Sequence, residues 1–128
     1  MDRILIVDDE FLIRYTLEEG LKDRGYDAYS AATVEEGLEF VRKYHPGVLL
    51  LDNLLENSVG MDEIVNFKNA DEELQVIMMT AYGSVSQAVE ATKRGAYDYI
   101  LKPFDVDEID MLIKRCLEQK RNRDSLVF

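Results

Sequence analysis

The feature that most constrains the fold is the apolar run at residues 47–51, GVLLL, which stops at Asp52. The run is too short for a helix and consists mainly of branched aliphatic residues, which is typical of a strand buried on both faces of a parallel sheet. Open α/β sheets bind their ligands beside the carboxyl ends of the strands. Asp52 ends the most apolar strand and is therefore a candidate reactive group.

Composition limits the classes of protein to consider. The chain has 128 residues, of which 47% are hydrophobic, and this suits one domain with its own core. Its net charge of −11 would repel nucleic-acid phosphates and anionic lipids, so we expect no direct contact with nucleic acid or membrane. The first residues lack a secretory pattern and no apolar stretch reaches membrane-spanning length, so we expect a cytoplasmic protein. The single cysteine, Cys116, is expected to be a small core residue.

Strand and helix patterns alternate five times along the chain. We expect capping boxes to open helices at Thr33 and Ser84, and we expect Ala88, Val89 and Thr92 to face inward on the second of these helices. The alternation predicts an α/β fold, with a parallel sheet, helices on both faces and right-handed crossovers. Strands are expected at residues 4–7, 27–31, 47–51, 75–80 and 96–101.

Four of the five expected strands end in functional groups, which are Asp8 with Asp9, then Asp52, Thr80 and Lys102. These ends share one edge of the sheet, so their side chains can converge. Neighbouring carboxylates repel one another and require a cation, and oxygen ligands favour a hard divalent ion such as Mg²⁺. An ammonium and a hydroxyl group then complete a cradle for a phosphoryl group. The pattern predicts phosphoryl transfer to a carboxylate, with Asp52 as the nucleophile.

These strand-end motifs carry a family resemblance. The segments VDDE at 7–10, LD at 51–52, MTA at 79–81 and LKPF at 101–104 resemble the receiver domain of two-component response regulators, over residues 3 to about 120. The resemblance implies a flavodoxin-like, doubly wound (βα)5 fold with a five-stranded parallel sheet of order 2-1-3-4-5. It also implies that Asp52 accepts a phosphoryl group from a partner histidine kinase. The domain would catalyse only its own phosphorylation and dephosphorylation, so it is not expected to be an enzyme acting on an external substrate.

The resemblance assigns a role to each site residue. Asp9 and Asp52 would ligate Mg²⁺ directly, Asp8 would act through water, and the backbone carbonyl of Leu54 would be a further ligand. On the opposite side of the phosphoryl group, the implied contacts are Thr80 and Lys102, with a cis peptide bond between Lys102 and Pro103.

The resemblance also implies a switch. Tyr99 occupies the aromatic position three residues before the lysine, and phosphorylation would draw Thr80 toward the site so that Tyr99 packs inward. One added charge must bias a bistable element to act at a distance. The expected readout surface comprises the helix at 84–94, the strand at 97–101 and the helix at 105–120.

The stretch at 79–104 is most similar to receivers of nitrogen-regulator type, which activate σ54-dependent transcription. We therefore expect a receiver domain at 1–120, with 121–128 as a C-terminal extension or the start of a linker. Beyond it we expect an output domain, of the AAA+ σ54-activator type with a DNA-binding domain. A homodimer through the last two helices is also expected.

The chain departs from the family pattern in the loop after the acceptor, where Glu56 replaces a common proline and Val59 replaces a small polar residue. Leu54 and Tyr82 are bulky and cannot position an attacking water as an amide could. We therefore predict slow self-hydrolysis of the aspartyl phosphate.

Three other interpretations are weighed against this one. A haloacid-dehalogenase-like phosphatase would carry a second aspartate at the position of Leu54. A flavodoxin-like cofactor binder would require a glycine-rich phosphate loop, which the turns lack. The third is a receiver-like interaction module that works without phosphorylation. In such a module the aspartates would only cap a helix, and Tyr99 would only contribute to core or interface packing.

Overall fold

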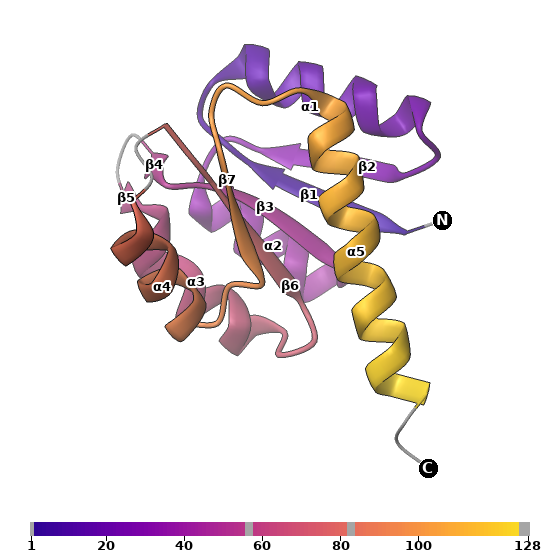
Figure 1. Ribbon diagram of the computed structural model, residues 1–128. Coiled ribbons are helices and arrows are strands. Elements are labelled where there is room, and N and C mark those ends of the chain that lie inside the picture. The colour runs from indigo at the N-terminus through magenta and orange to yellow at the C-terminus, as the bar shows by residue number, and fades with distance from the viewer. Residues whose placement is uncertain (1, 56–57, 82–83, 126–128) are drawn as a thin grey trace.

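The computed structural model of the chain describes residues 2–55, 58–81 and 84–125 (Figure 1). Neighbouring strands of its main sheet pair in parallel, in the spatial order β2-β1-β3-β6-β7. Counted by these five strands alone, the order is 2-1-3-4-5, which confirms the predicted fold. The strands are β1 (Arg3–Val7), β2 (Asp27–Ala31), β3 (Val48–Asp52), β6 (Gln75–Thr80) and β7 (Asp98–Leu101).

Helices cover both faces of the sheet because successive strand residues point to opposite sides. Ile4 and Ile6 of β1 belong to the core under two helices, whereas Leu5 and Val7 belong to the core under the other three. The first face carries α1 (Phe11–Asp23) and α5 (Val106–Ser125), and the second carries α2 (Val34–Tyr44), α3 (Gly60–Ala70) and α4 (Val85–Lys93).

The predicted caps are present. Thr33 Oγ1 accepts a hydrogen bond from the backbone N–H of Glu36, and Ser84 Oγ accepts one from that of Gln87. Each side chain satisfies one of the N–H groups that the first turn of a helix leaves unpaired.

Two features differ from the sequence prediction. The expected loop between β3 and α3 contains a small antiparallel pair, β4 (Leu54–Leu55) with β5 (Ser58–Val59). On α4, the buried residue is Ala91, whereas Val89 and Thr92 are exposed and Ala88 is only half-buried. The helix contacts the sheet through the small side chain of Ala91. The predicted inward face of α4 was therefore wrong, by about one residue position along the helix.

The opposite face is packed closely. A Cβ on Gly20 of α1 would lie 2.9 Å from both Cγ atoms of Val106, so α1 and the start of α5 approach without room for a side chain. Cys116 is buried in the same core, and this burial raises the pKa of its thiol to about 11. It is therefore a protonated core residue. None of the helices in the described ranges is long and apolar enough to cross a membrane.

Candidate functional site

Three carboxylates meet at the carboxyl edge of the sheet. Asp8 and Asp9 follow β1, Asp52 ends the neighbouring strand β3, and one oxygen from each residue lies within 4.8 Å of the others. Asp8 and Asp52 are buried, and Asp9 is half-buried. An all-oxygen donor set with one accessible member fits a hard divalent cation such as Mg²⁺, which keeps part of its water shell.

Lys102 supplies a positive charge on the other side of this cluster. Its Nζ lies 3.2 Å from Asp8 Oδ2 and 3.1 Å from Asp52 Oδ1. Burial alone would lower the pKa of the ammonium group, but the hydrogen bond to Asp52 and the charges of both carboxylates outweigh this and raise the pKa. The side chain therefore remains a cation beside Asp52.

Lys102 is placed by its backbone as well. Its N–H donates to Thr80 O at 2.7 Å, which continues the pairing of β6 with β7, and the Lys102–Pro103 peptide bond is cis.

The carboxylate of Asp52 resists ionisation. Burial, and then repulsion from Asp8, raise the pKa of Asp52, although Lys102 and a hydrogen bond from the backbone of Leu54 act in the opposite direction. A further cation beside Asp9 and Asp52 would relieve this repulsion, because opposite charge favours the ionised form.

Asp8 is fixed on both oxygens. Oδ1 accepts a hydrogen bond from the N–H of Glu10 at 2.9 Å, and Oδ2 faces Lys102. Arg14 of α1 donates to the backbone carbonyl of Asp8 at 2.8 Å. The carboxylate of Asp52 is likewise engaged, by Lys102 and by the backbone of Leu54, so the half-buried Asp9 is the most accessible of the three carboxylates. The role of Arg14 could not be found from the sequence, because it depends on how α1 turns back over the strand end.

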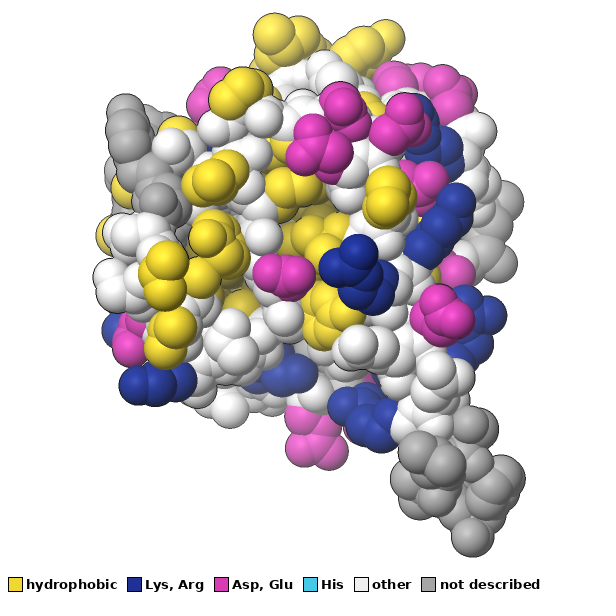
Figure 2. All heavy atoms as spheres, in the orientation of Figure 1, with side chains coloured by type: hydrophobic (Ala, Val, Ile, Leu, Met, Phe, Trp, Pro, Cys, Tyr) yellow, Lys and Arg dark blue, Asp and Glu magenta, His cyan; other side chains and the backbone are white. Residues whose placement is uncertain are grey.

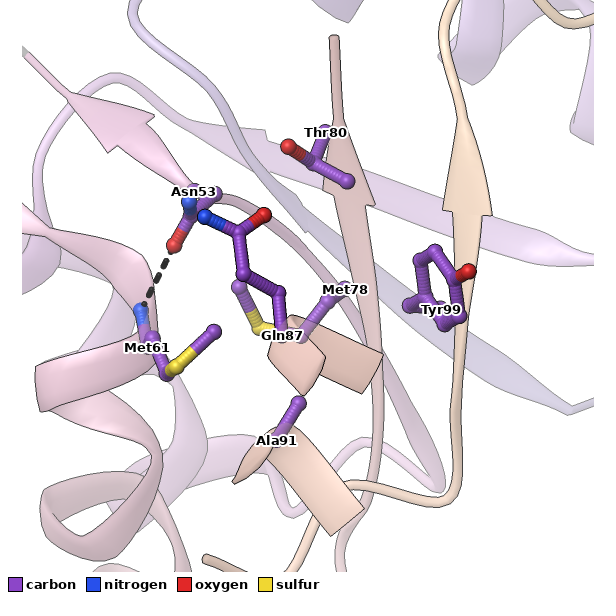
Figure 3. A pocket seen from close by; sticks show the side chains of 7 residues that line it. All are labelled: Asn53, Met61, Met78, Thr80, Gln87, Ala91 and Tyr99. Atoms are coloured by element: carbon purple, nitrogen blue, oxygen red, sulfur yellow. Dashed lines mark hydrogen bonds between the residues drawn. The ribbon is translucent and has the colours of Figure 1, made fainter. Parts of the chain in front are cut away.

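Thr80 and Tyr99 lie together on the face of the sheet that α4 covers. Tyr99 pairs in register with Met78, two residues before Thr80, so both side chains stand on the same side of the sheet. They line one small cavity of about 10 Å³ (Figure 3). Thr80 is buried and Tyr99 is half-buried. The cavity is completed by Asn53, Met61, Met78, Gln87 and Ala91.

Gly60 shapes the loop that follows Asp52, and this role could not be predicted from the sequence. A Cβ on Gly60 would overlap the backbone oxygen of Asp52, so only glycine allows α3 to start this close to the end of β3. Leu54 and Val59 pair across the β4–β5 hairpin, and both side chains are exposed. The expectations on Glu56 and Tyr82 concern residues outside the described ranges.

Asn53 was also missed. It follows Asp52 directly, and its backbone and side-chain oxygens accept hydrogen bonds from Gly60 and Met61 at the start of α3. An asparagine before a helix is a sequence signal for a cap, but here six residues separate it from the helix.

The arrangement can carry out phosphoryl transfer. It offers a carboxylate nucleophile, an adjacent ammonium, a hydroxyl at the next strand end and a cluster of acidic oxygens for a divalent ion. Developing charge on transferred phosphoryl oxygens is stabilised by cations held in place before the reaction.

Comparison with known proteins agrees with this chemistry. The sequence profile of the response regulator receiver domain matches residues 4–114. Sporulation initiation phosphotransferase F of Bacillus subtilis is 38% identical over 94% of this chain and 98% of its own length. The nitrogen assimilation regulatory protein NtrX of Azorhizobium caulinodans is 37% identical over 94% of this chain, but this chain spans only 27% of it. The solved beryllofluoride-activated NtrC4 receiver domain dimer has a TM-score of 0.88 and 34% identity, covering 94% of this chain and 99% of the NtrC4 chain.

Proposed function

Because the chain belongs to the response regulator receiver domain family, we propose that Asp52 is the residue that accepts the phosphoryl group. The chain is a phosphoacceptor receiver domain of a two-component system, related to regulators of the nitrogen-regulator type. The observation that carries the assignment of Asp52 is its position: a buried carboxylate at the end of the central strand, 3.1 Å from Lys102 and beside Asp8 and Asp9.

In the proposed reaction, a carboxylate oxygen of Asp52 forms a bond to phosphorus while the bond from phosphorus to the donor atom breaks. With a histidine kinase as donor, the leaving group is the imidazole nitrogen. Lys102 already holds the carboxylate, and it and Thr80 are placed to contact the oxygens of the incoming phosphoryl group. Beyond this self-modification, the domain is proposed to have no substrate of its own.

Members of the family bind Mg²⁺ at an acidic pocket, and the acidic cluster of this chain fits such an ion. We propose Asp9, Asp52 and the carbonyl of Leu54 as its direct ligands and Asp8 as a ligand through water. The greater exposure of Asp9 relative to the fully buried Asp8 supports this division. A bound Mg²⁺ would neutralise negative charge that builds up between the acceptor and the phosphoryl oxygens.

Thr80 and Tyr99 are proposed as the switch. They line one cavity beneath α4, so a movement of Thr80 toward a phosphoryl group changes the space available to the Tyr99 ring. The surface that would change comprises α4, β7 and α5. Figure 2 shows exposed hydrophobic side chains over this part of the molecule, and Val89, Leu101 and Met111 are among the exposed apolar residues there. We propose this surface as the homodimer contact.

The role of the whole protein is also a proposal. Receiver domains work with histidine kinases, and the matched region is about a quarter of the length of NtrX. We propose a cytoplasmic regulator in which residues 1–120 are the receiver, 121–128 begin a linker, and a σ54-activator output domain follows.

The test is incubation with acetyl phosphate and Mg²⁺, followed by intact mass spectrometry. We expect a mass gain of one phosphoryl group in the wild type and none in Asp52→Asn. Asp23→Asn, an exposed acid-to-amide change at the end of α1, is the matched control and should be modified like the wild type. Absence of modification in the folded wild type would instead support the interaction module that works without phosphorylation.

The lifetime of the aspartyl phosphate gives a second test. Neither Leu54 nor Tyr82 can orient a water for attack, so hydrolysis is proposed to be slow. A lifetime of only seconds in a phosphate-release assay would contradict this.

A further inference from the structure

The first turn of α3 is tied to the residue that follows the acceptor. The N–H of Gly60 donates to Asn53 O at 2.7 Å. The N–H of Met61 donates to Asn53 Oδ1 at 3.1 Å (Figure 3). The residue in the usual capping position, Val59, offers no side-chain acceptor. Asn53 therefore acts as the helix cap from a position seven residues upstream, and satisfies two of the unpaired N–H groups at once.

These bonds hold Asn53 and the start of α3 together beside the site. The third hydrogen bond of Asn53 is donated by its own N–H to Met79 O at 2.9 Å, which continues the pairing of β3 with β6. Asn53 is thus held by both the sheet and the helix. Leu54 comes next in the chain, and its backbone donates a hydrogen bond to the Asp52 carboxylate.

We propose that Asn53 is a positioning residue for phosphoryl transfer: its side-chain oxygen, by holding Met61, fixes the backbone of Leu54 beside Asp52. The inference rests on the proposed function, because the Leu54 carbonyl matters only if it faces a metal ion. Groups that orient metal ligands without touching the metal commonly change the affinity for it by about 10- to 100-fold when removed.

The plain alternative is that Asn53 is only a helix cap. Losing a cap lowers the free energy of unfolding wherever the cap is. The two roles therefore differ in whether metal binding changes, and a matched cap on another helix provides the control. Thr33 caps α2 from the usual position directly before the helix, its Oγ1 accepting from the N–H of Glu36 at 3.2 Å, and it is not among the proposed ligands.

The test compares Asn53→Ala with Thr33→Ala. The affinity of the unphosphorylated proteins for Mg²⁺ is measured by NMR titration, and hydrogen exchange of the Met61 amide is followed in the same samples. We expect Asn53→Ala to weaken Mg²⁺ binding about tenfold or more and to expose the Met61 amide. Thr33→Ala should leave both unchanged, although it lowers stability. Asn53→Asp keeps an acceptor for Met61 and should restore protection of that amide, with Mg²⁺ affinity at least equal to that of the wild type.

The inference is overturned if Asn53→Ala exposes the Met61 amide and binds Mg²⁺ as the wild type does. If Asn53→Ala does not fold, Asn53→Ser provides the same comparison with a shorter acceptor. Failure of the proposed function looks different: the wild type itself would then bind no Mg²⁺ or take no phosphoryl group from acetyl phosphate.

Discussion

The helices α4 and α5 flank the edge strand β7 on opposite faces, and they are attached to the sheet in different ways. α5 buries a row of four apolar side chains together with the carboxylate of Asp110. Among the described residues of α4, only Ala91 is buried, and Val85 is 80% exposed. The apolar area that a helix removes from water sets most of the cost of moving it. By this measure α5 is the helix that is firmly fixed to this edge of the sheet, and α4 is the one that can move at lower cost.

Polar contacts follow the same division. On the α5 side, Tyr26 donates a buried hydrogen bond to Asp110 Oδ1 at 2.6 Å. On the α4 side, Arg94 links the end of the helix to Glu90 and to Asp62 of α3, at 2.9 and 2.8 Å. These ion pairs are exposed, and exposed pairs contribute little to stability. The movable helix is the one next to Thr80 and Tyr99, where a phosphorylation signal would begin.

The largest difference is expected from deleting apolar side chains in the two helices. Ile113→Ala in α5 should lower the free energy of unfolding by about 2–5 kcal/mol, because the side chain is fully buried. Val89→Ala in α4 should change it by no more than about 0.5 kcal/mol. Urea denaturation monitored by circular dichroism measures both. Equal losses in the two variants would show that α4 is packed as firmly as α5.

The next effect comes from the buried hydrogen bond on α5. Tyr26→Phe leaves one oxygen of the Asp110 carboxylate without this donor and should cost about 1–3 kcal/mol in the free energy of unfolding. Tyr15→Phe removes a hydroxyl from a tyrosine that is 56% exposed and is the matched control, with no expected change. A Tyr26→Phe protein as stable as the control would mean that Asp110 does not depend on this bond.

Two buried aspartates, Asp110 on α5 and Asp52 at the end of β3, should respond to pH in opposite directions. For Asp110, burial acts to raise the pKa, but hydrogen bonds from Tyr26 and Lys114 outweigh it and lower the pKa. Its contribution to stability is present above the pKa of the unfolded chain and is lost as the pH falls through the folded value. Asp52 has a raised pKa, so the folded protein favours its protonated form and loses stability as the pH rises through the range between the unfolded and the folded value.

Without Mg²⁺ at pH 7, Asp52→Asn should therefore raise the melting temperature, and the gain should fade at acidic pH. Asp110→Asn should lower the melting temperature at pH 7 and flatten the acid side of the profile. Thermal melts from pH 3 to about 8 test both, covering the range in which carboxylates titrate. An Asp52→Asn protein that is less stable than the wild type at pH 7 would refute the repulsion assigned to the site.

The smallest effect on stability is expected at Arg94. Arg94→Ala should cost at most about 1 kcal/mol, since its partners are exposed. Hydrogen exchange should nevertheless speed up in α4 while α5 stays protected. Lys93→Ala removes a neighbouring exposed charge and is the control. Unchanged exchange in α4 would show that Arg94 does not hold the helix.

The sequence could predict the sheet and most of the site because both depend on order along the chain. Runs such as VLLL and VIMM specify buried strands, and parallel strands bring Asp8, Asp52, Thr80 and Lys102 to one edge whatever the loops do. The strand order and the chemistry follow from these few positions.

The parts that could not be predicted depend on close approach in three dimensions. The inward face of α4 was misassigned because its residues are mostly small or polar, so several faces look equally apolar. The Tyr26–Asp110 hydrogen bond joins residues 84 positions apart, and the sequence around each residue contains no pattern that predicts the contact. Position 60 requires glycine because the backbone oxygen of Asp52 occupies the space that a Cβ would need, and only the three-dimensional structure shows this.

The central claim is that Asp52, among three neighbouring aspartates, carries the phosphoryl group. The most direct measurement is reduction of the phosphorylated protein with borohydride, which converts an aspartyl phosphate to homoserine, followed by peptide sequencing in a mass spectrometer. We predict homoserine at position 52 and unmodified aspartate at positions 8 and 9. Homoserine at position 8 or 9, or its absence from a protein that has gained a phosphoryl group, would contradict the account.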